Sequence, residues 1–420
     1  MAGQTPLGRV IPRHANDRVI EALADTRVVL LNGARQCGKS TLAGLLGRSR
    51  DAELRTLDRA ATREAAVFDP PTFVESGRLL VIDEIQRVPE LLLAIKERVD
   101  TDPRPGQFLL TGSARVLGLK ALPDTLIGRM ETIELWPLAQ GEIDGEPDGF
   151  VDAIFELGAG FRHRTAETRS GYIGRIVRGG FPEAIARTSD RRTRFFENYL
   201  ADLVNRDVIQ LTDVQRGAEL RTLTRLVAAR SGQLLVPGSL AGLLGLSQRT
   251  VERYLTLLEE VFLIKRIPAW SRSPSSRATR APKAVYVDSG LAAAALGQDE
   301  SSLRRVGAPL GELLEGFVLS ELARQLSWSK QVADLFHYRT KDQVEVDAVI
   351  ENRRGQVVAI EVKSSTTVRG DDFAGLRHLY SRLGSDLVVG VVLYAGQETL
   401  SFGDRMLAVP ISALWERRRS

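Results

Sequence analysis

The sequence predicts an α/β protein of several domains that begins with a parallel sheet, and three observations lead to this fold class. Apolar runs typical of buried strands open the segments 27–40, 78–86 and 107–115. Helical patterns such as 89–100 alternate with these runs, as in a parallel sheet covered on both faces. At 420 residues the chain exceeds one ordinary core, so about two to four domains are expected.

Composition and charge are those of a globular protein from a reducing compartment. Hydrophobic residues make up 43% of the chain and charged residues 26%. The net charge is only +4, so any affinity for nucleic acid would have to come from local clusters. Cys37 is the single cysteine, which excludes an internal disulfide. No export signal opens the chain and no apolar run approaches the ~20 residues of a membrane span, so we expect a cytoplasmic protein without a membrane partner.

The most specific motif is Gly-x-x-x-x-Gly-Lys-Ser, which directly follows the first apolar run and precedes a helical pattern. Gly33 and Gly38 let backbone N–H groups surround a triphosphate, and Lys39 supplies a cation to the β and γ phosphates. The hydroxyl of Ser40 can bind Mg²⁺. The sequence therefore predicts a loop that binds ATP and consists of Gly33, Ala34, Arg35, Gln36, Cys37, Gly38, Lys39, Ser40 and Thr41.

Two further strand ends carry side chains that suit phosphoryl transfer. Asp83 and Glu84 end the second apolar run; Asp83 is predicted to hold Mg²⁺ and Glu84 to orient or deprotonate the attacking water. Ser113 follows the third run and is predicted to sense the γ-phosphate, with a capping turn as the alternative. Together these positions predict a P-loop ATPase with an additional strand in its sheet.

Arg129 stands just before a strand-like segment. An arginine in this place can reach a phosphate across a subunit boundary, which would make ATP hydrolysis depend on a homo-oligomer. A surface or structural arginine is the alternative. We therefore expect a homo-oligomer in which Arg129 acts as a catalytic residue on the ATP bound by a neighbouring subunit.

Gly, Pro and Asp collect after residue 142, which places the first domain boundary near 148. We predict an ATPase domain at 1–148, a helical lid at 149–230, a winged helix-turn-helix at 231–284 and an α/β domain at 285–420. Within the third segment a short helix, a Gly-Leu-Ser turn and a second helix follow one another, and Ser247 can cap the second helix. Its predicted core consists of Leu240, Leu243, Leu244, Val251, Tyr254, Leu255 and Leu258.

The outer face of this second helix carries Gln248, Arg249 and Arg253. Such residues can contact base edges and phosphates, which favours nucleic acid, and DNA in particular, as a partner. A winged helix that serves only as a protein spacer is the alternative. The following segment 265–283 contains six basic residues and no acid, so it suits either phosphate contacts or a solvated linker.

The segment 332–363 has the pattern of strands, with a hairpin turn at Asn352 and Gly355. Residues two apart in a strand share a face, so Glu361 and Lys363 point the same way, and the hairpin brings Asp347 beside Glu361. Two carboxylates can hold Mg²⁺ or Mn²⁺, while the lysine can orient water or stabilise a phosphate. A surface ladder of ion pairs is the alternative.

The spacing Asp-x(13)-Glu-x-Lys resembles the PD-(D/E)XK nuclease superfamily. This resemblance implies a restriction-endonuclease-like fold, a catalytic Lys363, and a third metal-binding acid on the preceding helix. Glu315 fits that position in the helix pattern at 311–326, and Glu321 is the less favoured alternative. Val346 stands where the superfamily usually has a proline.

The chain as a whole is similar to a large prokaryotic family of AAA-type ATPases with a C-terminal domain of unknown function. The resemblance covers nearly all of the chain and rests on motifs in a fixed order, among them GARQCGKS, LLVIDEIQ, LLTGSAR, GRMETIELWPL and IEVKSS. It implies ATP hydrolysis and a winged-helix middle. We predict a Mg²⁺-dependent ATPase that acts on nucleic acid and carries a C-terminal metal-dependent nuclease-like domain. The alternative is an ATP-driven switch or scaffold whose C-terminal half binds protein or DNA without cleavage.

Overall fold

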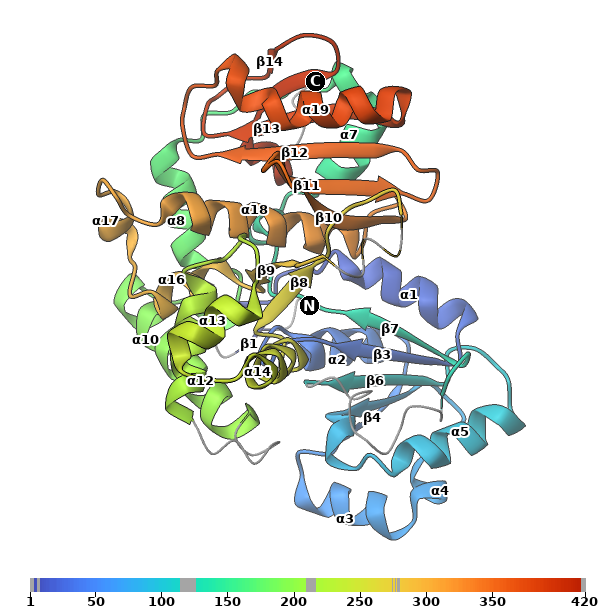
Figure 1. Cartoon of the computed structure of the whole chain (residues 1–420). Helices are drawn as coiled ribbons and strands as arrows, with labels where there is room; N and C mark the ends of the chain where they lie inside the picture. The colour runs from blue at the N-terminus through green and yellow to red at the C-terminus, as the bar shows by residue number, and fades with distance from the viewer. Residues whose placement is uncertain are drawn as a thin grey trace. The chain divides into compact units, whose positions relative to one another are not determined.

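The computed structural model describes residues 4–5, 8–113, 126–208, 217–273, 275, 277 and 280–416. The chain folds into two compact units, and Figure 1 labels many of their elements. The first unit comprises Pro12–Pro137 with Glu260–Phe262, and the second comprises Met1–Ile11, Leu138–Glu259 and Leu263–Ser420. None of the helices in the described part of the chain is long and apolar enough to cross a membrane.

The first unit is built around a parallel sheet with the strand order β4-β5-β6-β3-β7. Strand β6 lies between β3 and β5, so the predicted additional strand is confirmed. All neighbouring strands are parallel, which brings their carboxyl ends to one edge. The elements in chain order are α1 Ala15–Asp25, β3 Val28–Asn32, α2 Lys39–Ser49, β4 Glu53–Thr56, α3 Ala60–Phe68, α4 Pro70–Phe73, β5 Leu80–Asp83, α5 Leu91–Thr101, β6 Phe108–Gly112 and β7 Met130–Glu134.

The central strand β3 is apolar at nearly every position because both faces of the sheet are covered. Val28 and Leu30 lie in a core cluster with Ile95 of α5 and other buried side chains of that face. Val29 and Leu31, which point to the opposite face, are equally buried, and α2 packs against β3, β5 and β6. This explains why the sequence shows a continuous apolar run instead of alternation.

The second unit opens with helices that pack around a later helix. The elements are β1 Gln4–Thr5, β2 Gly8–Arg9, α6 Gln140–Asp144, α7 Phe150–Leu157, α8 Arg169–Arg178, α9 Pro182–Ile185, α10 Ser189–Asp202, the π-helical η4 Leu203–Val208, α12 Gly217–Ala228, α16 Ser289–Ala295 and α17 Glu300–Leu303. Helices α8, α10 and α12 all contact α16. The described residues of the segment 149–230 are thus largely helical, while the lid itself and the boundaries predicted at 230 and 284 remain predictions.

The predicted winged helix-turn-helix consists of α13 Pro237–Leu244, α14 Gln248–Glu260, and the antiparallel strands β8 Ile264–Ile267 and β9 Lys283–Tyr286. The hydroxyl of Ser247 accepts a hydrogen bond from the backbone N–H of Thr250 at 3.1 Å, so Ser247 is the predicted cap. Leu240, Val251, Leu255 and Leu258 are buried as predicted. Leu243 is not, because the helix α13 packs through Leu240 and Ala241 and leaves Leu243 61% exposed.

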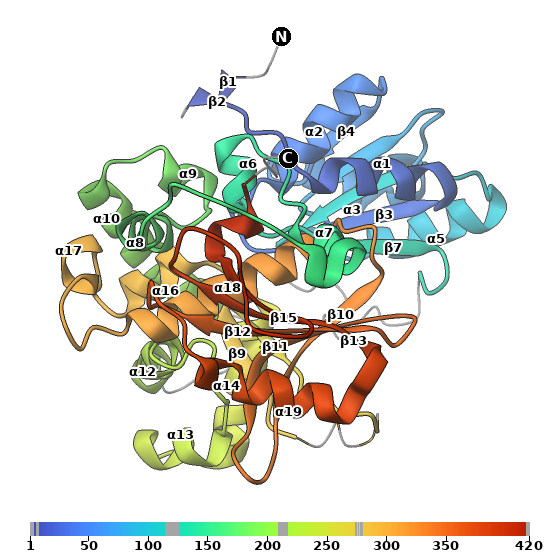
Figure 2. The same cartoon turned by 90° about the horizontal axis from the view of Figure 1, so that it is seen from above.

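The C-terminal part of the second unit is a mixed sheet of order β10-β11-β12-β13-β15-β14. Strands β10, β11 and β12 are antiparallel, whereas β12, β13 and β15 are parallel. Figure 2 shows the sheet between α18 and α19. The elements are α18 Leu310–Leu326, β10 Ala333–Arg339, β11 Glu345–Asn352, β12 Val357–Lys363, α19 Ala374–Leu383, β13 Leu387–Tyr394, β14 Leu400–Ser401 and β15 Met406–Pro410.

The winged helix and this sheet share backbone hydrogen bonds. Between β8 and β9 the chain passes along β10, where the N–H of Trp270 donates to the carbonyl of His337 at 2.6 Å. The N–H of His337 in turn donates to the carbonyl of Pro268 at 3.0 Å. Arg277 lies 4.7 Å from the ring centroid of Phe336 and forms an ion pair with Glu351. The loop between the two wing strands is therefore attached to the C-terminal sheet.

We expect Leu255→Ala and Leu243→Ala to have very different effects on stability. Leu255 is fully buried in the winged helix, so its truncation should lower the free energy of unfolding by about 2–5 kcal/mol. Leu243 is mostly exposed, so its truncation should change that energy by no more than about 0.5 kcal/mol. Urea unfolding followed by circular dichroism measures both. Equal losses for the two variants would contradict this description of the core.

Candidate functional site

The predicted ATP-binding loop begins where β3 ends, at a point that only glycine can occupy. A Cβ added at Gly33 would lie 2.1 Å from the carbonyl oxygen of Leu135. The N–H of Gly33 is held by the side chain of Asn32 at 3.0 Å. Gly38, which precedes α2, has a φ of +104°, a backbone conformation that side chains disfavour. The two motif glycines are thus required by backbone geometry.

The side chains of the loop are braced from within the first unit. Lys39 is 4% exposed, and its ammonium donates to the carbonyls of Gly33 at 2.9 Å and Ala34 at 2.7 Å. Arg13, which the sequence did not single out, donates to the carbonyl of Cys37 at 2.8 Å and to that of Trp136 at 2.7 Å. The loop is therefore preformed, with its lysine bonded to the loop's own backbone.

Asp83 and Glu84 lie at the carboxyl edge of the same sheet, and one hydroxyl connects them. Thr111 of β6 donates to the carboxylate of Asp83 at 2.6 Å. The same oxygen of Thr111 accepts the backbone N–H of Glu84 at 3.0 Å. Glu84 has a φ of +61°, a strained conformation for a residue with a side chain. This backbone conformation turns the chain away from the axis of β5 directly after Asp83.

The carboxylate of Glu84 is engaged by two neighbouring side chains. The hydroxyl of Ser113 donates to it at 3.2 Å, and the amide of Gln86 donates to it as well. The amide of Gln86 also reaches the hydroxyl of Ser113 at 2.9 Å. The structure thus brings Asp83, Glu84 and Ser113 together at the edge where the loop begins. Sequence reasoning missed Gln86, because nothing in the motif indicates that it turns back toward the acid.

Arg129 lies elsewhere in the first unit. It precedes β7, whose amino end is paired with the amino end of β3, so Arg129 is at the sheet edge opposite the loop. Its guanidinium binds the carboxylate of Asp100, with one contact at 3.1 Å, and this hydrogen bond lowers the pKa of Asp100. Arg129 therefore does not reach the loop of its own sheet. Its role across a subunit boundary remains a prediction.

In the winged helix, α14 presents Gln248, Arg249 and Arg253 to solvent, as predicted. Within the part of the chain that the structure describes, neither Arg249 nor Arg253 is bonded to another side chain. The intervening Glu252 is paired with Arg266 at 2.6 Å, which reduces its repulsion of an approaching anion. The outer face of α14 is therefore locally basic.

Among the described residues of the basic segment 265–283, most basic side chains are already paired. Four of its six basic side chains form ion pairs with acids from distant parts of the sequence or from α14. These are Arg266, Arg272, Arg277 and Lys283. Most of the charge that suggested phosphate contacts is thus used inside the second unit.

In the C-terminal sheet the predicted hairpin is present. The register pairs Ala348 of β11 with Ile360 of β12, so Asp347 and Glu361 are the next residues along the two strands. Asp347 accepts the backbone N–H of Val362 at 2.9 Å, and Lys363 donates to Glu361 at 2.9 Å. Asp347, Glu361 and Lys363, the three residues predicted for the hairpin, therefore lie close together.

Helix α18 contributes Glu315 to this place, while Glu321 points elsewhere. Glu315 shares the ammonium of Lys283 with Asp347. Glu321 is fully buried, pairs with Arg324 and accepts the backbone N–H of Gln140 at 3.1 Å. Of these two glutamates, Glu315 is the one near the hairpin acids.

Lys283 lies in the middle of these acids and was not anticipated. The residue is 1% exposed, and its ammonium lies 2.6 Å from Glu315, 3.0 Å from Asp347 and 3.0 Å from Glu345. It comes from β9, the second strand of the wing. The only signal in the sequence was a lysine at the start of an apolar strand, which does not reveal its partners.

Burial and charge act against each other in this cluster. Burial alone would lower the pKa of Lys283, but the carboxylates of Asp347, Glu315 and Glu345 raise it above its ordinary value. Burial, together with the charge of Asp347, raises the pKa of Glu315 to about 8 and that of Glu361 to about 7. The ammonium of Lys283 is therefore held in its charged form.

This arrangement does not fit the divalent ion predicted for Glu315, Asp347 and Glu361. Two of the three carboxylates are already bridged by an ammonium, and the third is bonded to Lys363. Among the described residues, no group of three or more acid, histidine or cysteine side chains is arranged to hold a metal ion.

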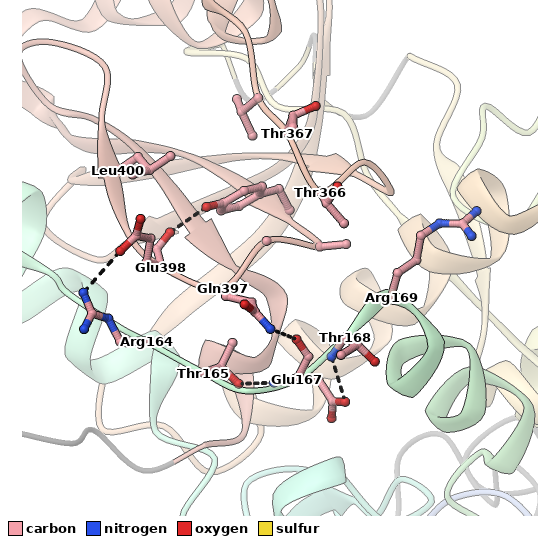
Figure 3. Close-up of a pocket in the computed structure, with 14 residues that line it drawn as sticks. Arg164, Thr165, Glu167, Thr168, Arg169, Thr366, Thr367, Gln397, Glu398 and Leu400 are labelled. Carbon is pink, nitrogen blue, oxygen red and sulfur yellow. Dashed lines mark hydrogen bonds and ion pairs between the residues drawn. The ribbon is translucent and has the colours of Figure 1, made fainter.

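A separate cleft of about 710 Å³ lies where β12 and β13 end, and Figure 3 shows it. Thr366 and Thr367 line one side. The Arg164–Glu398 ion pair, at 3.2 Å, lies at one end of the cleft and Arg169 at the other. No residue that the sequence singled out lines this cleft.

Three family models match successive parts of the chain. Residues 25–144 match an AAA domain. Residues 169–302 match a domain of unknown function, DUF8612, and residues 310–414 match another, DUF4143.

Two solved structures match the chain at low similarity. A Walker-type ATPase of Pyrococcus abyssi is 14% identical, with a TM-score of 0.37, and the match covers 68% of this chain and 96% of that one. The RuvB Holliday junction branch migration motor of Thermotoga maritima is 22% identical, with a TM-score of 0.30 and coverage of 61% and 90%.

Curated relatives match along most of the chain. An uncharacterised protein of Haemophilus influenzae is 23% identical over 323 residues, which cover 74% of this chain and 72% of that protein. Uncharacterised proteins of Mycobacterium tuberculosis and Mycobacterium bovis are each 30% identical over 405 residues, covering 95% of this chain and 83% of theirs. The chain therefore belongs to the family of these uncharacterised mycobacterial proteins, and its first unit is an AAA-type ATPase domain.

Proposed function

We propose that the chain is a Mg²⁺-dependent ATPase whose nucleotide cycle acts on nucleic acid, with DNA as the favoured partner. The proposal of ATP hydrolysis rests mainly on one observation: Asp83, Glu84 and Ser113 lie together at the sheet edge where the loop begins. This edge offers a phosphate-binding backbone, an acid for the metal and an acid for the attacking water within one unit.

The side chains present fit Mg²⁺ with ATP. The hydroxyl of Ser40 and the carboxylate of Asp83 are the hard oxygen donors that Mg²⁺ prefers. Mg²⁺ supplies charge neutralisation at the β and γ phosphates. Lys39 would exchange the two carbonyls that it now binds for phosphate oxygens, which are stronger acceptors.

Glu84 is proposed as the base that orients or deprotonates water. In the structure its carboxylate is bonded to Ser113 and Gln86, so these bonds have to be released before it can act on water. A γ-phosphate that binds the hydroxyl of Ser113 would remove one of them. Ser113 thereby connects the predicted sensing of the γ-phosphate to the position of the base.

The winged helix is proposed to bind nucleic acid through α14. The supporting observation is that Arg249 and Arg253 are exposed and bonded to no other described side chain, while most of the basic side chains of the segment 265–283 are engaged in ion pairs. The available positive charge of the motif therefore lies on α14 and not on the wing. In helix-turn-helix proteins the second helix is the element that usually enters the major groove.

Two functions are open to the C-terminal sheet: metal-dependent phosphodiester cleavage, and binding without cleavage. The position of Lys283 between Glu315 and Asp347 favours binding without cleavage. The sheet would then help to hold DNA or a protein partner while the ATPase unit changes nucleotide state.

Two substitutions separate ATP binding from hydrolysis. Lys39→Ala should abolish tight ATP binding, because it removes the loop's ammonium. Glu84→Gln should retain binding and slow hydrolysis by about two orders of magnitude or more, because it removes only the base. Binding is measured by calorimetry and hydrolysis by phosphate release. Arg87→Ala is the control: Arg87 is close in sequence but pairs with Asp58, and it should hydrolyse ATP at the parental rate. Parental hydrolysis by Glu84→Gln would show that another group is the base.

The role of Arg129 is tested by mixing variants. If Arg129 acts on a neighbouring subunit, Arg129→Ala should bind ATP but hydrolyse it poorly, and mixing it with Lys39→Ala should restore activity at shared interfaces. Asp100→Ala is the matched control, because it removes the partner of Arg129 but leaves the arginine itself. Its hydrolysis should stay near the parental rate. No recovery in any mixture, with assembly intact, would indicate that Arg129 has only the structural role.

Binding of DNA is tested on α14. The double variant Arg249→Ala/Arg253→Ala should weaken duplex binding by about tenfold or more and lower the slope of log affinity against log salt by about 2. Fluorescence anisotropy at several KCl concentrations measures both quantities. Arg272→Ala, which removes an exposed arginine already paired with Asp386, should bind within about twofold of the parent. Unchanged affinity of the double variant would favour the winged helix as a protein spacer.

A further inference from the structure

The C-terminal sheet contains a buried lysine in the place where the hairpin acids were predicted to hold a metal. We infer that Lys283 is a built-in cation that takes the position of a divalent ion among the carboxylates of Glu315, Asp347 and Glu345, and that it closes this site to metals. The inference is independent of ATP hydrolysis and of DNA binding by α14, and it assigns a role to a lysine on the strand β9.

The first argument is the match between donors and acceptors. An ammonium group has three N–H donors and no acceptor. The ammonium of Lys283 has three carboxylate neighbours, on Glu315 at 2.6 Å, Asp347 at 3.0 Å and Glu345 at 3.0 Å. Two of the donors are hydrogen bonded to Glu315 and Asp347, and Glu345 adds an ion pair, so the ammonium is held by side chains of the protein without an added ion.

The second argument concerns the remaining oxygens. The other carboxylate oxygen of Asp347 accepts the backbone N–H of Val362 at 2.9 Å. Glu361 accepts from Lys363 at 2.9 Å, so the predicted catalytic lysine is also bonded to a predicted metal ligand. A divalent ion entering here would have to break bonds at every carboxylate that could bind it.

The third argument is that Lys283 is fixed by its strand. It is paired with Ile267 of β8 and forms a bridge with Leu234 on its other side. The carbonyl of the next residue, Ala284, accepts the N–H of Gly232 at 2.8 Å. The backbone of Lys283 thus has a partner on both sides, and its side chain is only 1% exposed, so the strand holds the ammonium among the acids.

The contrast with Lys39 supports this assignment. Lys39 binds two neutral carbonyls of its own loop, which a phosphate can replace as a better partner. Lys283 binds three carboxylates from β11 and α18, and no stronger acceptor for an ammonium is available nearby. One buried lysine is thus placed to exchange partners, and the other is placed to keep them.

The test is Mn²⁺ binding to the full chain without nucleotide, measured by calorimetry and by the loss of the free Mn²⁺ signal in electron paramagnetic resonance. The parental protein should show no binding that Asp347→Asn removes, up to about 1 mM Mn²⁺. Lys283→Ala should gain one site, at least about tenfold tighter than any parental binding, because the carboxylates lose their cation. The double variant Lys283→Ala/Asp347→Asn should lose that site.

Lys363→Ala is the matched control, because it removes a lysine from the same cluster but leaves Lys283 among the acids. It should gain no Mn²⁺ site. Thermal unfolding gives a second readout: Lys283→Ala should melt at a lower temperature than the parent, and Mn²⁺ should raise that temperature while leaving the parent's unchanged.

Two results would overturn the inference. One is Mn²⁺ binding by the parental protein that Asp347→Asn abolishes, which would show an open metal site. The other is a folded Lys283→Ala protein that gains no Mn²⁺ site, which would show that the lysine does not stand in for an ion. If Lys283→Ala fails to fold, the comparison of the parent with Asp347→Asn still decides whether the site is closed. None of these results bears on ATP hydrolysis or on α14.

Discussion

The ammonium of Lys283 is the interaction on which the second unit depends most. A buried carboxylate without a partner lowers the stability of the fold, and here three acids from β11 and α18 lie around the ammonium of Lys283. The lysine that balances them belongs to the winged helix. Breaking a buried pair by removing one partner costs far more than the pair's net stabilisation, because the charge left behind has lost its water. The winged helix and the C-terminal sheet are therefore bound by charge as well as by the backbone bonds of His337.

The ATPase unit depends on a different constraint, the close approach of backbone segments at one sheet edge. Gly33 lies against Leu135, and Thr111 connects Asp83 with the backbone of Glu84. These contacts fix the positions of the groups before nucleotide arrives, which limits the reorganisation needed during the reaction. The two units thus differ in how they hold their buried lysines. In the first unit Lys39 can exchange its carbonyl partners for phosphate, whereas in the second unit Lys283 keeps its carboxylate partners.

Local patterns in the sequence predicted much of the fold. The strand-loop-helix pattern around Lys39, the turn capped by Ser247 and the alternation that puts Glu361 and Lys363 together all depend on short-range geometry. In each case the spacing of residues along the chain determines which side chains share a face. The preference for Glu315 over Glu321 came instead from the resemblance to the nuclease superfamily.

What the sequence did not reveal depends on contacts between distant segments. Lys283 counted as one of several basic residues, because its partners lie on strands and a helix far along the chain. Gln86 gave no signal because a single strained residue, Glu84, turns the chain back on itself. Leu243 has the spacing of a core residue, but only the tertiary packing of α13 decides which side of so short a helix is covered.

The position of β9 has a practical consequence for any attempt to divide the protein. The domain boundary predicted between 284 and 285 falls inside β9, which spans Lys283–Tyr286. A fragment beginning at 285 would retain Glu315, Asp347 and Glu345 but lack the lysine that neutralises them. Such a fragment would carry excess negative charge in its interior, and an ion from the buffer would have a place to enter. Metal affinity measured on an excised C-terminal piece would then be a property of the cut and not of the whole chain.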